Sequence, residues 1–206
     1  RWAGWVTRQR TAAAGDILLE EQGPGGVFRI EVLRPARSDG PWEIDNSSLV
    51  LRVVYGETAV LLPADLDYRG ITELAENLQP DQMQAQVCVL PHRGTAPADD
   101  GFSKPRIEEV LQDSLAPFLD RAQATWVVAE MGNPRPVLGR ISRDAQRAHD
   151  LARRFVEERY GPSAWLSTDR DLAIQFDSDG HAWTLTTQAQ LARGSGGEDV
   201  ASDVAG

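Results

Sequence analysis

Apolar residues follow two different periods along this chain, and these periods predict both strands and helices. The apolar runs 58–62 and 87–90 are too short for typical helices and are rich in Val and Leu, so we expect two buried strands. Between them, residues 69–78 carry apolar side chains at helical spacing, and Pro80 follows. These three segments predict a strand-helix-strand unit.

The same patterns extend over the rest of the chain and predict an α/β fold. We expect a strand pair at 16–19 and 27–33, and a hairpin of 49–55 with 58–62 across Gly56 and Glu57. A helical period over 107–118 is interrupted, and Pro117 is expected to kink it. The remaining predicted elements are a strand at 124–131, a long helix capped by Ser142, and strands at 164–167, 172–176 and 182–186.

Two residues with metal-binding side chains follow the paired apolar runs. Asp65 comes after the first run and His92 after the second, so both are expected at the same rim of the sheet, where ligands often bind α/β proteins. One carboxylate can bridge two metal ions, and a neutral imidazole is a good zinc ligand. The alternatives are that Asp65 caps a helix or stabilises a turn, although Asp67 is the closer cap, and that His92 is a polar loop residue.

An ordered set of motifs resembles a known family. The segments D-N-S-S-L-V-L-R at 45–52, L-L-P-A-D at 61–65 and L-P-H-R-G-T at 90–95 look like the second half of the metallo-β-lactamase-fold domain of ComEC-type competence proteins and their soluble relatives. In that family the segments read roughly N-S-L-V-L-R, L-L-T-G-D and P-H-H-G-S. The resemblance covers nearly the whole chain except its tail. It implies a metallo-β-lactamase-like αββα sandwich, of which this chain is the second half only.

This resemblance also implies a division of the chain. Residues 1–14 would be a connector from a missing N-terminal half, and residues 15–191 the C-terminal half of the domain. Residues 192–206 are dominated by Gly, Ser, Glu and Asp, which predicts a disordered tail. A start at Arg1 fits either a truncated sequence or a natural half-domain.

The chemistry implied by the resemblance is metal-dependent hydrolysis, directed at a phosphodiester. Two zinc or manganese ions would activate a water, Asp65 would bridge them, and His92 would ligate a metal or donate a proton. The family's H-x-H-x-D-H motif is missing, and the chain has only three histidines. We therefore expect no activity from this chain alone. The other ligands would come from the missing half or a complementing chain, and a nuclease-like enzyme restored by a partner is the third hypothesis.

Arginine stands at two positions where the family has histidine. Arg93 replaces the second His of P-H-H-G, and Arg140 falls where the family often has Gly-His-Pro. A guanidinium stays protonated and cannot ligate a metal, but two of them can clamp a phosphate or carboxylate. Either the site has drifted, or the domain is a degenerate, non-catalytic interaction or anion-binding module. Pro63 and Ala64 in place of Thr-Gly are a third departure.

The composition of the chain limits which classes of partner we expect it to bind. A net charge of -10 argues against a broad nucleic-acid-binding face, although the parent protein could still act on a nucleic acid. No apolar run reaches the roughly 18 residues of a membrane span, so we expect a cytoplasmic location for a soluble relative, or attachment to a membrane protein. Cys88 is the only cysteine, which excludes an internal disulfide and predicts a small buried side chain.

Overall fold

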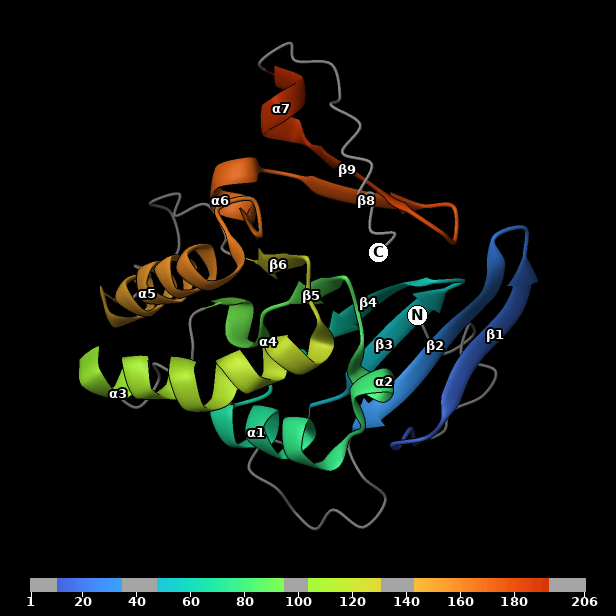
Figure 1. The fold of residues 1–206 in the computed structure, drawn as a ribbon, viewed down its shortest axis with the longest axis horizontal. Helices are drawn as coiled ribbons and strands as arrows, with labels where there is room; N and C mark the ends of the chain where they lie inside the picture. The colour runs from blue at the N-terminus through green and yellow to red at the C-terminus, as the bar shows by residue number, and fades with distance from the viewer. Residues whose placement is uncertain (1–10, 35–47, 95–103, 131–142, 193–206) are drawn as a thin grey trace, which may run out of the picture.

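Seven strands form one mixed sheet in sequence order, β1 to β7 (Figure 1). The structure is a computed structural model, and it describes residues 11–34, 48–94, 104–130 and 143–192. Strands β1 to β4 are antiparallel neighbours, whereas β4 to β7 run parallel. The bounds are β1 Ile17–Gly23, β2 Gly26–Arg34, β3 Val50–Tyr55, β4 Thr58–Leu62, β5 Val87–Val89, β6 Trp126–Ala129 and β7 Trp165–Ser167. The predicted α/β class is confirmed.

Helices connect the parallel strands, and the predicted strand-helix-strand unit is present as β4, α1 and β5. Helix α1 buries Ile71, Leu74 and Ala75, and Asp67 caps it by accepting a hydrogen bond from the Gly70 N–H at 2.8 Å. Asp67 is therefore the cap, and Asp65 is not. The helices are α1 Tyr68–Asn77, α2 Pro80–Met83, α3 Lys104–Val110, the π-helix η3 Leu111–Leu115, α4 Ala116–Ala122, α5 Arg143–Tyr160, α6 Thr168–Asp171 and α7 Gln188–Ala192, with the 3-10 turn η2 at Pro91–Gly94.

The parallel part of the sheet is buried on both faces, and its side chains alternate between two cores. On one face Leu61, Cys88, Val127 and Trp165 pack with residues of α1, α4 and α5. On the other face Val87, Val128 and Leu166 pack against a separate hairpin, β8 Ile174–Ser178 with β9 Trp183–Thr187. Helices, sheet and hairpin thus form three layers (Figure 1). Burial on both faces is the usual state of parallel strands.

Hydrogen bonds join the β8–β9 hairpin to the large sheet where three turns meet. The Glu57 N–H donates to the Gly180 carbonyl at 2.6 Å, and the hydroxyls of Thr58 and Ser178 lie 2.7 Å apart. A Cβ atom on Gly25, Gly56 or Gly180 would overlap the backbone of a facing turn. These three glycines, the glycine junction, let the turns of β1–β2, β3–β4 and β8–β9 approach closely.

Two predicted elements differ from the structure. The interrupted helix of 107–118 is one helical path from Lys104 to Ala122, in which η3 directly precedes Pro117. Pro117 has no N–H to donate to the Asp113 carbonyl, and just before it the Ala116 N–H bonds to the Leu111 carbonyl, five residues back. The strand predicted from residue 172 begins at Ile174, since Leu172 has a left-handed φ of 62°.

Some predictions fall on residues outside the described ranges. These are most of the N-terminal connector, the C-terminal tail from residue 193, and the Ser142 cap of α5. Within the described residues, none of the helices combines the length and apolar character needed to cross a membrane.

A buried histidine on α5 makes the stability of the fold depend on pH. His149 is 3% exposed, and its ring lies 5.2 Å from that of Trp165, edge to face. Burial lowers the pKa of His149 below 6.5, helped by Arg153 and opposed by Asp169 and Asp150. Below pH 6.5 the unfolded chain thus binds more protons than the folded one, so stability is lost as the pH falls from 6.5 toward the folded pKa.

Urea unfolding at two pH values checks this sign. Between about pH 7.5 and 5.5, His149 is expected to account for a loss of at most about 1.4 kcal/mol. A His149→Phe variant should lack this part of the pH dependence while keeping the contributions of all other groups. An equal loss in both proteins would show that His149 does not titrate as its burial requires.

Candidate functional site

Strands β4 and β5 bring Asp65 and His92 to the same edge of the sheet. The parallel register pairs Val60 with Val87 and Leu61 with Cys88, a constant offset of 27 positions. Beyond the strand ends, Asp65 and His92 lie on the segments that follow β4 and β5. The two loops are in contact there, because the His92 N–H donates to the Ala64 carbonyl at 3.3 Å. The loops after β4 and β5 therefore lie at the same edge of the sheet, as the strand-helix-strand pattern predicts.

Both loops hold a residue in a strained backbone conformation. Ala64 has a φ of 54° and His92 a φ of 47°, in the left-handed region that residues with a Cβ rarely adopt. Such a conformation costs roughly 1–2 kcal/mol per residue. Gln123 and Leu172 also have a positive φ, but Ala64 and His92 lie on two loops in contact, and such strain is common at functional sites, so the pair favours this edge as the candidate site.

Close packing fixes the turn that carries His92. Gly94 ends η2 with a φ of 80°, and a Cβ atom there would lie 2.9 Å from the Cβ of Ala129 on β6. The turn can sit against β6 only because residue 94 is glycine. The sequence Pro-His-Arg-Gly thus holds the His92 backbone between the Ala64 loop and β6.

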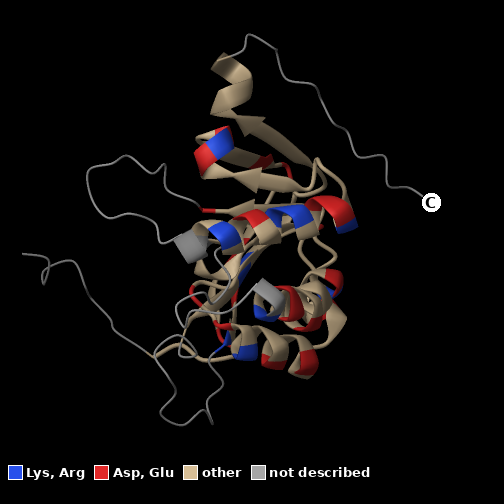
Figure 2. Cartoon of the chain, turned by 90° about the vertical axis from the view of Figure 1, so that its left-hand side faces the viewer, with Lys and Arg blue, Asp and Glu red and all other residues tan. Residues whose placement is uncertain are grey.

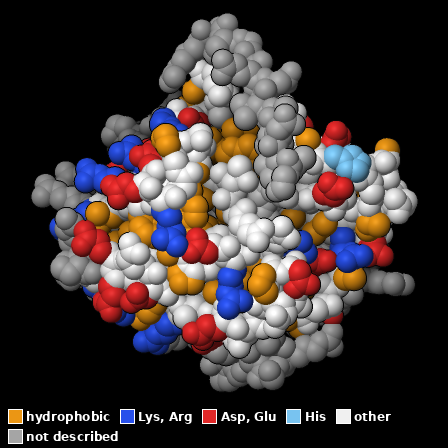
Figure 3. Space-filling view, viewed as in Figure 1, with side chains coloured by type: hydrophobic (Ala, Val, Ile, Leu, Met, Phe, Trp, Pro, Cys, Tyr) orange, Lys and Arg blue, Asp and Glu red, His pale blue; other side chains and the backbone are white. Residues whose placement is uncertain are grey.

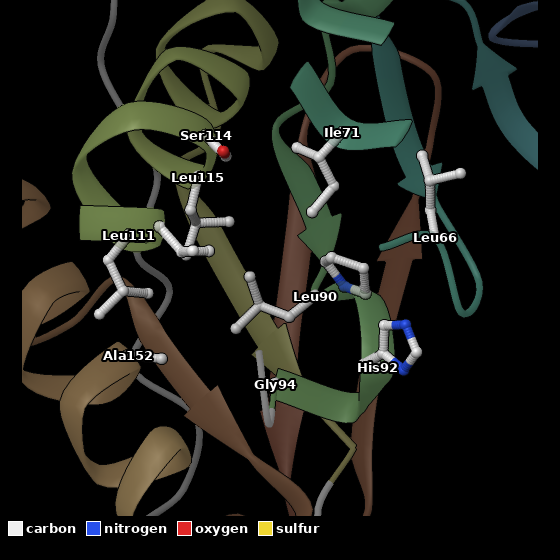
Figure 4. Close-up of a pocket in the computed structure, with 11 residues that line it drawn as sticks. Leu66, Ile71, Leu90, His92, Gly94, Leu111, Ser114, Leu115 and Ala152 are labelled. Atoms are coloured by element: carbon white, nitrogen blue, oxygen red, sulfur yellow. The ribbon is translucent and has the colours of Figure 1, made fainter. Parts of the chain in front are cut away.

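Behind His92 lies a small apolar cavity, shown in Figure 4. Its volume of about 20 Å³ is enough for roughly one water molecule. Leu90, Leu111 and Leu115 extend into it, whereas His92 stands at its border (Figure 4). His92 is half-buried, and Asp65 is exposed beyond it. This cavity is too small and too apolar to hold a polar substrate.

The predicted arginine clamp stays a prediction. Arg93 lies within η2, but its side chain is outside the described part of the structure, and so is the whole of Arg140. Cys88 lies inside β5, fully buried, and burial raises the pKa of its thiol well above the ordinary value. A protonated, buried thiol is a poor nucleophile and a poor metal ligand.

Sequence reasoning missed a further carboxylate at the same edge. Val89 pairs with Val128 across β5 and β6, so the exposed Glu130 follows β6 at the level of the His92 turn. The sequence pattern does point to Glu130, since Glu130 follows an apolar run just as Asp65 does. Among the residues that the structure describes, however, no three His, Cys, Asp or Glu side chains are grouped closely enough to hold a metal ion.

The described surface around the helices carries charges of both signs. Basic and acidic residues are interspersed along the described helices in Figure 2 and over the face shown in Figure 3. The expectation that the chain has no broad nucleic-acid-binding face stays a prediction.

Models of protein families, curated proteins and solved structures were all compared with this chain, and none of them matches it.

Proposed function

We propose that this chain forms the second half of a ComEC-like metallo-β-lactamase-fold domain and contributes Asp65 and His92 to a two-metal hydrolytic centre. The observation that supports the proposal is the contact between the loops that follow the parallel strands β4 and β5, since each loop carries one of these donors. The expected substrate class is a phosphodiester, since the motifs resemble those of competence proteins.

Two features of the fold support the family assignment. The hairpin β8–β9 stacks on one face of the large sheet while helices cover the other, which is how half of an αββα sandwich would be layered. In addition, Ala64 stands where the resembling motif L-L-T-G-D has glycine, and its φ of 54° is one that glycine adopts without strain.

The donors fit a metal centre only in part. A carboxylate and an imidazole are suitable ligands for zinc or manganese, but the described residues supply no third ligand close by. The sequence contains no H-x-H-x-D-H motif. We therefore place the remaining ligands on a polypeptide segment outside these 206 residues and expect no hydrolysis by this chain alone.

The residues of this chain would position the reacting groups. Bound metal ions would lower the pKa of a water and polarise the phosphoryl oxygen. Asp65 offers an exposed carboxylate, and the strained turn of η2 fixes the backbone from which the His92 imidazole extends. Arg93 follows directly and would contribute charge to the phosphate, not a lone pair to the metal.

Paramagnetic broadening by Mn²⁺ tests where this chain binds a divalent ion. Addition of Mn²⁺ to the isotope-labelled chain is expected to broaden the backbone amide signals of residues 63–67 and 90–94 first. The reason is that an ion held between Asp65 and His92 lies next to both loops. Amides of α2, which precedes β5 and so lies toward its other end, provide the internal control.

Other outcomes would count against the proposal. Broadening centred away from these two loops would place the ion elsewhere, and uniform broadening would show no specific site. If Mn²⁺ had no local effect but phosphate shifted the Arg93 signals, the alternative of a metal-free anion-binding module would be favoured.

A further inference from the structure

A polar groove runs beside the candidate site, between α1 and the α3–η3 helix. Its volume is about 400 Å³, far larger than the cavity behind His92. The groove is lined by Tyr68, Arg69, Thr72, Glu73, Arg106, Glu109, Val110, Asp113 and Ser114. We call it the Tyr68 groove. Val110 and Ser114 line both hollows, so the groove adjoins the space behind His92.

Two guanidinium groups are gathered around the Tyr68 ring. The Cζ atom of Arg69 lies 5.7 Å and that of Arg106 5.6 Å from the ring centroid. Arg69 Nε also donates to the Tyr68 hydroxyl at 3.3 Å. Hydrogen bonds to Glu109 and then to Tyr68 raise the pKa of Arg106. Tyr68 therefore gathers two permanent positive charges in the lining of the groove, one from α1 and one from α3.

Most of the acidic groups in the groove are paired with arginine. Glu109 lies 2.7 Å from Arg106, and Glu73 lies 3.1 Å from the buried Arg34. The Arg106–Glu109 pair joins exposed side chains one helical turn apart, and such pairs contribute little to stability, so an incoming anion can compete with Glu109. Asp113 is the third acid of the lining, and it opposes an anion.

Hydroxyl groups from both walls also line the groove, and one of them lies on an unusual helical segment. Thr72 Oγ1 donates to Ser114 Oγ at 2.9 Å, and Ser114 belongs to the π-helix η3. Short π-helical segments are frequent at functional sites, because the extra residue in the turn redirects neighbouring side chains. Here the π-helix places Asp113 and Ser114 in the wall of the groove.

We propose that the Tyr68 groove binds a phosphate group through Arg69 and Arg106. The planar guanidinium groups match phosphate oxygens in pairs, and the hydroxyls of Tyr68 and Thr72 lie within the same lining. This site does not depend on a metal ion. It can be tested, and can fail, independently of the centre at Asp65 and His92.

Titration of the metal-free chain with inorganic phosphate in EDTA tests the site. The readouts are the arginine Nε–Hε signals and the backbone amides of residues 68–73 and 106–114, with chloride at equal ionic strength as the blank. Dimethyl phosphate forms a second arm: tighter binding of the diester identifies a nucleic-acid-type phosphate, and tighter binding of inorganic phosphate identifies a free or terminal one.

Matched variants test which side chains bind the phosphate, and each has an expected change in affinity. Arg69→Gln and Arg106→Gln should each weaken phosphate binding roughly tenfold or more, because each removes a charge-assisted hydrogen bond. Arg106→Lys should fall between Arg106→Gln and the wild type. Arg29→Gln is the control, since Arg29 is an equally exposed, ion-paired arginine on distant β2. Asp113→Asn should tighten binding.

The proposal is overturned by two results. One is the absence of phosphate-dependent shifts at residues 68–73 and 106–114 in the wild type. The other is an unchanged affinity in an Arg69→Gln, Arg106→Gln double variant whose amide spectrum shows that it is folded. Neither result bears on metal binding at Asp65.

Discussion

Gly180→Ala is expected to destabilise the protein by about 2 to 5 kcal/mol. Gly180 has a φ of 97°, and its Cβ would overlap the backbone of Gly25 in the facing turn. A left-handed backbone is unfavourable in free energy for a residue with a Cβ. The overlap of this Cβ with a rigid turn destabilises the fold further, as overpacking does. Urea unfolding of the wild type and the variant measures the difference.

Gly161→Ala is the matched control for this change. Gly161 has nearly the same φ, 95°, but nothing lies within 4 Å of its Cβ position. Only the backbone cost of about 1–2 kcal/mol should therefore appear. If the two variants were destabilised equally, the contact between turns at the glycine junction would have no energetic role.

Gly180→Ala is also expected to disturb packing on the face of the sheet that the β8–β9 hairpin covers. Phe176 of β8 packs between Trp126 of β6 and Trp183 of β9, with ring centroids 5.7 Å and 6.0 Å away. Because the glycine junction fixes the hairpin at its turn, Gly180→Ala is expected to loosen this aromatic stack. Tryptophan fluorescence shifted toward that of exposed indole, before global unfolding, would report the change.

The strand-helix-strand unit and the edge it creates could be predicted from sequence. Residues 59–62 and 87–90 are apolar throughout, and burial on both faces, as in parallel strands, explains such short apolar runs. The helical period between them then leaves one arrangement, with both strand ends on one rim. For this reason the sheet edge that carries Asp65 and His92 could be predicted from local sequence patterns alone.

The glycine junction and the π-helix could not be predicted in the same way. Gly25 and Gly180 are far apart in the sequence, so their close approach is set by tertiary packing and leaves no local pattern. Pro117 predicts an interruption of the helix. A kink and a π-turn can both accommodate the N–H that proline lacks, and the packing of neighbouring residues decides between them. The Tyr68 groove, which η3 helps to line, was missed for this reason.

The second large effect is expected at His92 in a zinc titration. Asp65→Asn should weaken the zinc response of the His92 imidazole signals roughly tenfold or more, because loss of a supporting side chain alone often costs that much. Asp67→Asn is the matched control. It removes a carboxylate two residues away, but asparagine caps a helix as well as aspartate does, so α1 should keep its start.

The other histidines serve as internal references. His181 is exposed and lies 3.6 Å from Glu57, so it can respond to zinc by itself, whereas His149 is buried. Neither variant should change the response of His181, because the glycine junction is remote from the Asp65 loop. The effect of Asp65→Asn is thus read as a change at His92 relative to His181.

This zinc titration, followed at the three imidazole rings in the wild type, Asp65→Asn and Asp67→Asn, is the most direct test of the candidate centre. His92 is expected to respond in the wild type and in Asp67→Asn, and Asp65→Asn alone is expected to suppress this response. A His92 response that is absent from the wild type, or that survives Asp65→Asn unchanged, would contradict the assignment of Asp65 and His92 to one metal centre.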